Sequence, residues 1–109
     1  MTSSSESDIV ILIVDDHPMT RNMVKAILRG GGFEKIIQAE DGHDAIMTLR
    51  KEKVDMIICD WNMPTTTGLE VLQEVRSIDG MKDLPFIMLT AEAYRENVVA
   101  AAKAGVTDY

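Results

Sequence analysis

The sequence is poor in the residues that cross-link, anchor or positively charge a protein. Its single cysteine, Cys59, excludes a disulfide within the chain. Lysine and arginine number 11 against 18 aspartates and glutamates, and the net charge of -7 argues against nucleic acid as a direct ligand. No apolar run approaches the roughly 20 residues of a membrane helix, and no basic and then apolar leader opens the chain. We therefore expect an acidic cytoplasmic domain with no nucleic-acid partner and no membrane contact.

Aromatic side chains are also scarce, whereas aliphatic residues are plentiful, so the core is expected to be aliphatic. The 109 residues suit one domain. Cys59 lies within an apolar run and is expected to be a buried core residue rather than a reactive thiol. Residues 1–8, MTSSSESD, are small and polar and are expected to form a disordered tail, which leaves residues 9–109 as the domain.

Short apolar runs alternate with helix-like segments along the chain. Strands are expected at residues 9–14, 35–40, 55–60 and 84–90, and residues 106–109 have the pattern of the opening of a fifth strand. Helices are expected from residue 18 to the glycines at 30–32, at 41–52, from 68 onward and at 91–105. The strands are continuously apolar, which is typical of sheets covered on both faces. Strict alternation of such strands with helices predicts an α/β domain around a parallel sheet.

Each of the first three helices is expected to bury one apolar face. The expected faces are Met19, Met23 and Ile27 with Val24 and Leu28 in the first helix, Ala45, Ile46 and Leu49 in the second, and Leu69, Leu72 and Val75 in the third.

Polar side chains stand where three of the expected strands end. Asp15 and Asp16 follow the first strand, Asp60 ends the third, and Thr90 ends the fourth. Parallel strands present their carboxyl ends at one rim, and right-handed crossovers readily make the first and third strands neighbours. Three carboxylates there would repel one another and resist desolvation unless a cation bound them. Oxygen ligands suit a hard ion such as Mg²⁺, so the pattern predicts a magnesium site.

A plainer alternative is that Asp15 and Asp16 only begin the following helix, as acidic residues often do. Thr90, likewise, would be explained in an isolated strand by a hydrogen bond to local backbone. The arrival of Asp60 and Thr90 at the same rim favours the metal site over these alternatives.

The two histidines are not expected to take part in the site. His17 and His43 lie beside helix starts and are interpreted as surface residues, because neither has a partner at metal-like spacing. Trp61, next to Asp60, is interpreted as a partly exposed neighbour that can report on the site.

Four stretches carry a resemblance to a known family. ILIVDDHPMTR, AEDGHDAI, DWNMPTTTGLEVL and MLTAEAYRENVVAAAKAGVTDY, taken together and in this order, resemble the receiver domain of two-component response regulators, and most closely the CheY-type chemotaxis regulators. The resemblance covers nearly the whole chain. It implies a flavodoxin-like, doubly wound parallel sheet with the strand order 2-1-3-4-5.

The resemblance also implies roles for residues at the rim. Asp60 is similar to the aspartate that accepts a phosphoryl group from a sensor histidine kinase or from a small donor such as acetyl phosphate. Asp16 and Asp60 resemble the direct Mg²⁺ carboxylates, and Asp15 resembles the second acidic residue, which acts mainly through water. Asn62 matches the position whose backbone carbonyl completes the metal site.

Two further positions resemble the family's switch. Thr90 matches the hydroxyl that turns toward the phosphoryl group, and Tyr109 matches the aromatic residue that reorients with it. The partners implied are a chemotaxis histidine kinase upstream and a flagellar motor switch protein downstream.

The chain departs from the family pattern at its end. Receivers continue past the position of Tyr109 with the rest of the fifth strand, a lysine followed by a proline, and a final helix. Lys103 is not expected to replace that lysine, because it lies within the alanine-rich helix. One explanation is that the sequence is a fragment of a receiver; the other is that a homodimer covers the exposed sheet edge.

Three functions are therefore weighed. The leading hypothesis is a phosphorylation-controlled signalling switch that catalyses only its own phosphorylation and dephosphorylation and is otherwise not an enzyme. The alternative is a binding or dimerisation module with a receiver fold that is not phosphorylated, which the missing lysine favours. A metal-dependent phosphohydrolase ranks last, because no general acid is found near Asp60.

Overall fold

The computed structural model describes residues 6–61, 63–64, 66–89, 98–100 and 102–103. The elements in chain order are η1 (Glu6–Asp8), β1 (Val10–Val14), α1 (Pro18–Gly30), β2 (Lys35–Ala39), α2 (Gly42–Lys51), β3 (Met56–Asp60), α3 (Gly68–Arg76) and β4 (Phe86–Leu89). Residues 98–100 and 102–103 are helical, within the expected fourth helix. The expected fifth strand lies outside the described residues, and of the expected tail only a 3-10 turn at Glu6–Asp8 is described.

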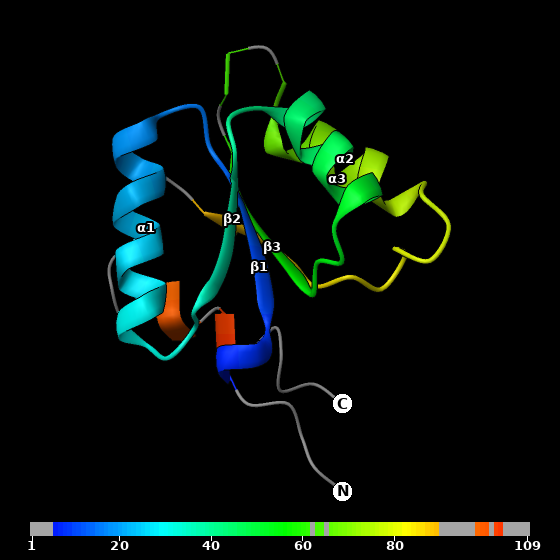
Figure 1. Ribbon diagram of the computed structural model, residues 1–109. Coiled ribbons are helices and arrows are strands. Elements are labelled where there is room, and N and C mark those ends of the chain that lie inside the picture. Colours follow the sequence, from blue (N-terminus) through cyan, green and yellow to red (C-terminus); the bar gives the residue numbers. More distant parts are fainter. Residues whose placement is uncertain (1–5, 62, 65, 90–97, 101, 104–109) are drawn as a thin grey trace, which may run out of the picture.

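The described strands form one parallel sheet in the order β2-β1-β3-β4. β1 and β3 are central, and each is almost completely buried, which explains their uninterrupted apolar sequences. The predicted α/β class and the predicted pairing of the first strand with the third are both confirmed. The carboxyl ends of the strands meet at one rim, which is the upper edge of the sheet in Figure 1.

Helices cover both faces of the sheet (Figure 1). α1 packs on one face together with Val98 and Ala102, and α2 and α3 pack on the other face. The core is aliphatic, as expected, apart from the fully buried Phe33. Within the described residues, no helix combines the length and the apolar character that a bilayer crossing requires.

The apolar face predicted for α1 is partly wrong. Val24 and Leu28 are buried as expected, but Met19 is 85% exposed and Met23 is 50% exposed. Each residue advances the helix by about 100°, so Met19 lies roughly 140° around the helix from Val24. The helix therefore turns Val24 and Leu28 toward the sheet and leaves the two methionines in solvent.

The face predicted for the third helix needs a similar correction. Val75 is buried as expected, but its partner on the inner face is Val71, four residues earlier, and Leu69 is 43% exposed. Residues four apart, such as Val71 and Val75, differ in direction by about 40° around a helix, whereas Leu69 and Val75, which are six apart, differ by about 120°. Val71 therefore shares the inner face with Val75, and Leu69 does not. The predicted inner face of α2 is confirmed, since Ala45, Ile46 and Leu49 are all buried.

Candidate metal centre

The sheet brings the aspartates of two distant segments together. Val14 of β1 is the register partner of Cys59 of β3, so Asp15 and Asp60 follow side by side at the rim. One ligand atom from each of Asp15, Asp16, His17 and Asp60 lies within 4.8 Å of the others. The predicted clustering of the three aspartates is therefore present, and a histidine has joined it.

Asp15 is the most constrained member of this cluster. Its residue surface is only 7% exposed, and its side-chain Oδ1 accepts a hydrogen bond from the backbone N–H of His17 at 2.8 Å. Its own N–H donates to the carbonyl of Ala39 at 3.1 Å, which ties the rim to β2. The N–H of His17 thus holds the carboxylate, and the bond to Ala39 holds the backbone that carries it.

Arg21, which the sequence did not single out, fixes the backbone at Asp15. Its Nη1 donates to the Asp15 carbonyl at 2.7 Å, and its Nε donates to Oε1 of Gln38 at 3.0 Å. The side chain therefore links α1, the end of β1 and β2. Its position one helical turn after His17, at the end of the stretch DDHPMTR, is the signal that could have revealed it.

The interpretation of His17 as a plain surface residue is wrong in one respect. Its side chain is 68% exposed, as a surface residue would be, but its Nδ1 lies 3.3 Å from Oδ1 of Asp15 and 3.2 Å from Oδ1 of Asp16. Spacing along the sequence could not show these contacts. Asp15 and Asp16 directly precede His17, and only the turn between β1 and α1 decides whether the imidazole faces them. His43 is exposed on α2 and is not part of the cluster.

The residues present fit a divalent cation. Oδ1 of Asp16 is fully buried. Nδ1 of His17 lies 3.2 Å from it without making a hydrogen bond, and no other residue that the structure describes donates one to it. A buried carboxylate oxygen left in this way is costly unless a cation or donor satisfies it. Three neighbouring carboxylates also repel one another. A hard cation would satisfy the buried oxygen and would reduce this repulsion.

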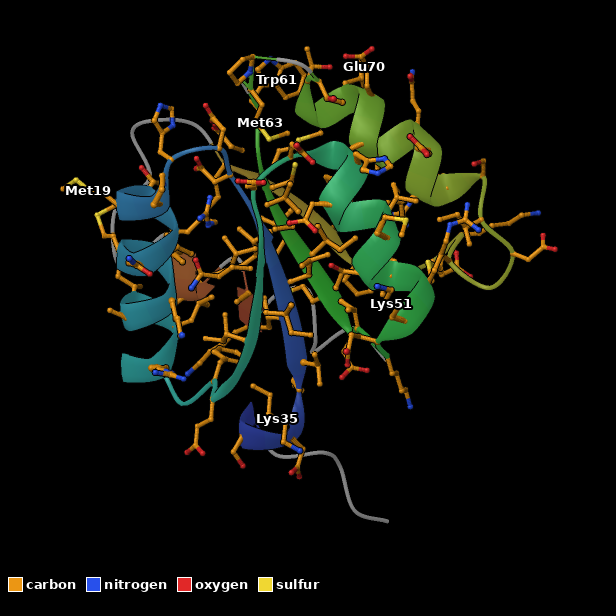
Figure 2. The ribbon with its side chains drawn as sticks, turned by 45° about the horizontal axis from the view of Figure 1, so that its top comes forward. Met19, Lys35, Lys51, Trp61, Met63 and Glu70 are labelled. Atoms are coloured by element: carbon orange, nitrogen blue, oxygen red, sulfur yellow. The ribbon has the colours of Figure 1, made fainter. Side chains whose placement is uncertain are left out.

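The loop after β3 holds Asp60 from the other side, and Figure 2 shows Trp61, Met63 and Glu70 gathered there beside the start of α3. The N–H of Trp61 donates to the carbonyl of Leu89 at 3.1 Å, and the N–H of Gly68 donates to the carbonyl of Trp61 at 2.8 Å. Met63 is 8% exposed and anchors the loop, whereas Trp61 is 44% exposed, as predicted.

Gly68 allows α3 to begin against the backbone of Asp60. A Cβ atom at residue 68 would stand 2.6 Å from the carbonyl oxygen of Asp60 and 2.7 Å from Sδ of Met88. Thr67 and Glu70 complete the junction with a capping box, in which each side chain accepts from the other's backbone N–H.

Cys59 confirms its predicted place in the core, since it is fully buried. Burial, and then the negative charges of Asp60 and Asp15, raise the pKa of its thiol to about 12. The thiol therefore stays protonated at neutral pH and does not compete for a metal.

Three predicted site residues cannot be placed. Asn62, Thr90 and Tyr109 lie outside the described residues.

Comparison with known proteins decides the family. The model of the response regulator receiver domain matches residues 11–109. This chain is a member of the response regulator receiver family. The matched range begins at the second residue of β1 and covers the other three described strands completely. The resemblance found from the sequence motifs is confirmed.

Individual relatives agree with this assignment. The chemotaxis protein CheY-3 of Vibrio cholerae is 44% identical over 99 residues, which span 91% of this chain and 76% of that protein. The structure of the chemotaxis response regulator CheY4 of Vibrio cholerae matches with a TM-score of 0.70 at 34% identity, over 93% of this chain and 88% of that chain. The response regulator TrrA of Thermotoga maritima, solved in complex with Mg²⁺-BeF, matches with a TM-score of 0.70 at 37% identity, over 86% of this chain and 80% of that chain. The receiver is therefore similar to CheY proteins in both sequence and fold.

Proposed function

We propose that this receiver is a phosphorylation-controlled signalling switch whose phospho-acceptor is Asp60. The observation that carries the proposal is the cluster of Asp15, Asp16 and Asp60 at the rim between β1 and β3. These carboxylates would hold a divalent cation, for which Mg²⁺ is the expected ion because oxygen atoms dominate the ligand set. The TrrA structure with Mg²⁺-BeF supports this choice by analogy.

Phosphorylation would proceed by direct attack of the Asp60 carboxylate on phosphorus. The P–N bond of the donor phosphohistidine breaks, its electron pair returns to the imidazole nitrogen, which takes up a proton, and an aspartyl phosphate forms. A bound divalent cation supplies charge neutralisation for the phosphoryl oxygens. The protein's own contribution is positioning: β3 fixes Asp60, and Arg21 fixes the backbone of Asp15 beside it.

The output would be a change in binding. By analogy with the family, the carbonyl of Asn62 would complete the metal site, and Thr90 and Tyr109 would couple phosphorylation to the partner surface. Similarity to CheY-3 supports a chemotaxis histidine kinase as the donor and a flagellar motor switch protein as the target, both met in the cytoplasm. On this proposal the chain turns over no diffusible substrate and is not an enzyme in that sense.

The test is phosphorylation by a small donor. With acetyl phosphate and Mg²⁺, we expect an intact-mass gain of one phosphoryl group that Asp60→Asn abolishes. Asp79→Asn, a matched change at an exposed aspartate outside the cluster, should leave the gain unchanged.

The opposite result has a clear meaning. If the folded chain binds Mg²⁺ but gains no mass, the binding or dimerisation module without phosphorylation becomes the better function. Turnover of small phosphate esters at enzyme-like rates would instead favour a phosphohydrolase.

A further inference from the structure

The feature that the receiver assignment leaves unexplained is His17. The two histidines of the chain differ sharply, because His43 is exposed on α2 and His17 lies at the acidic rim. The ligand set expected for a receiver is made of oxygen atoms from Asp15, Asp16, Asp60 and Asn62. An imidazole nitrogen within the same 4.8 Å cluster changes the chemistry of that set.

The ring nitrogen already stands at ligand spacing. Nδ1 of His17 is 3.2 Å from Oδ1 of Asp16 and 3.3 Å from Oδ1 of Asp15. Ligand atoms that each lie about 2.1 Å from one metal ion are about 3.0–3.5 Å apart when they are adjacent. Little rearrangement would therefore be needed for His17 and the two carboxylates to share an ion.

The backbone at His17 is held by its neighbours. Pro18 follows it, and a residue before proline is restricted to extended conformations, which agrees with φ -100° and ψ 113° at His17. The N–H of His17 donates to Oδ1 of Asp15 at 2.8 Å, and its carbonyl accepts from the N–H of Arg21 at 3.0 Å. Because the backbone is already fixed, ion binding would mainly have to restrict the rotation of the His17 side chain.

A second observation points to an ion next to this ring. Oδ1 of Asp16, which lies 3.2 Å from Nδ1, is fully buried and accepts no hydrogen bond from the described residues. An ion bonded to both atoms would satisfy this oxygen, and it would replace the contact that Nδ1 now makes with Oδ1 of Asp15 at 3.3 Å.

We propose that Nδ1 of His17 is an additional ligand of the cation site and makes this receiver bind Zn²⁺ more tightly than Mg²⁺. Neutral imidazole suits Zn²⁺, whereas Mg²⁺ dehydrates reluctantly and prefers oxygen. The two ions then compete for the same aspartates, and His17 sets the preference. The proposal rests on the proposed function only for the existence of the cation site.

The experiment is a pair of titrations, Zn²⁺ alone and Mg²⁺ alone, at one fixed pH, followed by calorimetry and by Trp61 fluorescence. The variants are His17→Ala, His17→Asn and the matched control His43→Ala. We expect both His17 variants to weaken Zn²⁺ binding by at least about tenfold, the lower end of what loss of an outer-sphere contact alone costs a metal site. Mg²⁺ binding should stay within about twofold, because Mg²⁺ does not depend on the nitrogen. His43→Ala should change neither ion.

Several results would overturn the proposal. Unchanged Zn²⁺ binding in His17→Ala would remove His17 from the ligand set. Equal weakening of Zn²⁺ binding and Mg²⁺ binding would make His17 a residue that positions Asp15 and not a ligand. Retention of Zn²⁺ binding in His17→Asn would show that the nitrogen is not required. In each of these outcomes the wild-type chain still binds Mg²⁺, so the cation site of the proposed function stands. Failure of the wild-type chain to bind either ion would overturn that site as well.

Discussion

The positively charged side chain of Arg21 organises the acidic site through the backbone, by hydrogen bonds to the Asp15 carbonyl and to Gln38. Its guanidinium donates to the main chain at Asp15 and to Gln38, so it fixes the position of the loop and leaves the carboxylates' negative charge available. Hydrogen bonds from a charged donor are worth about 1.5–3 kcal/mol each, more than neutral ones. The rim is therefore held by contacts to the backbone as well as by the sheet.

Arg21→Ala should lower the free energy of unfolding by about 1.5–3 kcal/mol, because the carbonyl of Asp15 loses its charged donor. It should also weaken Mg²⁺ binding, since the loop that carries Asp15 loosens. Urea unfolding and Trp61 fluorescence measure the two effects. Arg29→Ala, at an exposed position of the same helix, is the control and should change little. Equal losses in both variants would contradict a specific role for Arg21.

Cys59 makes the stability of the fold depend on alkaline pH. Its pKa rises from an ordinary thiol value of 9.0 to about 12 in the folded chain, mainly through burial and then through the negative charges of Asp60 and Asp15. Between these values the unfolded chain loses a proton that the folded chain keeps, so the free energy of unfolding falls as pH rises.

The Cys59→Ala variant should therefore lose stability less steeply than the wild type above pH 9. Urea unfolding at a series of alkaline pH values measures the two slopes. Identical slopes would show that Cys59 does not carry this pH dependence.

At the scale of elements, the start of α3 and the end of β3 are one structural unit. The capping box of Thr67 and Glu70 begins the helix, and Gly68 lets that first turn touch the backbone of Asp60. The helix thus determines how the strand end that carries the acceptor is placed.

Two glycine-to-alanine changes distinguish the contact between Gly68 and the backbone of Asp60 from a close contact with a side chain. Gly68→Ala would meet backbone at 2.6 Å, which cannot yield without moving Asp60, whereas Gly42→Ala would meet the side chain of Val71 at 2.9 Å. We expect Gly68→Ala to cost about 1–3 kcal/mol of stability and to impair Mg²⁺ binding. Gly42→Ala should cost less and leave Mg²⁺ binding unchanged. Thermal unfolding and Trp61 fluorescence test this order, and the reverse order would refute it.

At the scale of the whole molecule, the two faces of the sheet are covered, but its edges differ from its centre. β1 and β3 are buried, whereas every residue of β4 is only partly buried, and within the described residues its strand partner is β3 alone. Apolar strands at the edge of a sheet favour pairing with another chain.

Self-association through β4 stays a prediction. Sedimentation equilibrium at micromolar concentration should show a mass above that of the 12.1 kDa monomer. A monomeric mass for the wild-type chain would rule the homodimer out.

Much of the fold follows from local patterns. The apolar runs and the helix signals between them predicted four strands, their parallel pairing and the arrival of Asp15, Asp16 and Asp60 at one rim, because these depend on residue order and on the geometry of parallel sheets. The roles of Asn62, Thr90 and Tyr109 stay predictions from the family resemblance.

What only the tertiary structure decided are the features that depend on rotation and on contacts between elements. The packing of α1 on the sheet selected Val24 and Leu28 over Met19, which the apolar spacing did not distinguish. The turn between β1 and α1 brought His17 back to the carboxylates, and α1 carried Arg21 to the end of β1. The sequence determines which residues reach the rim, since strand ends are local; the three-dimensional fold decides which side chains meet there, since that depends on angles between elements that no local pattern contains.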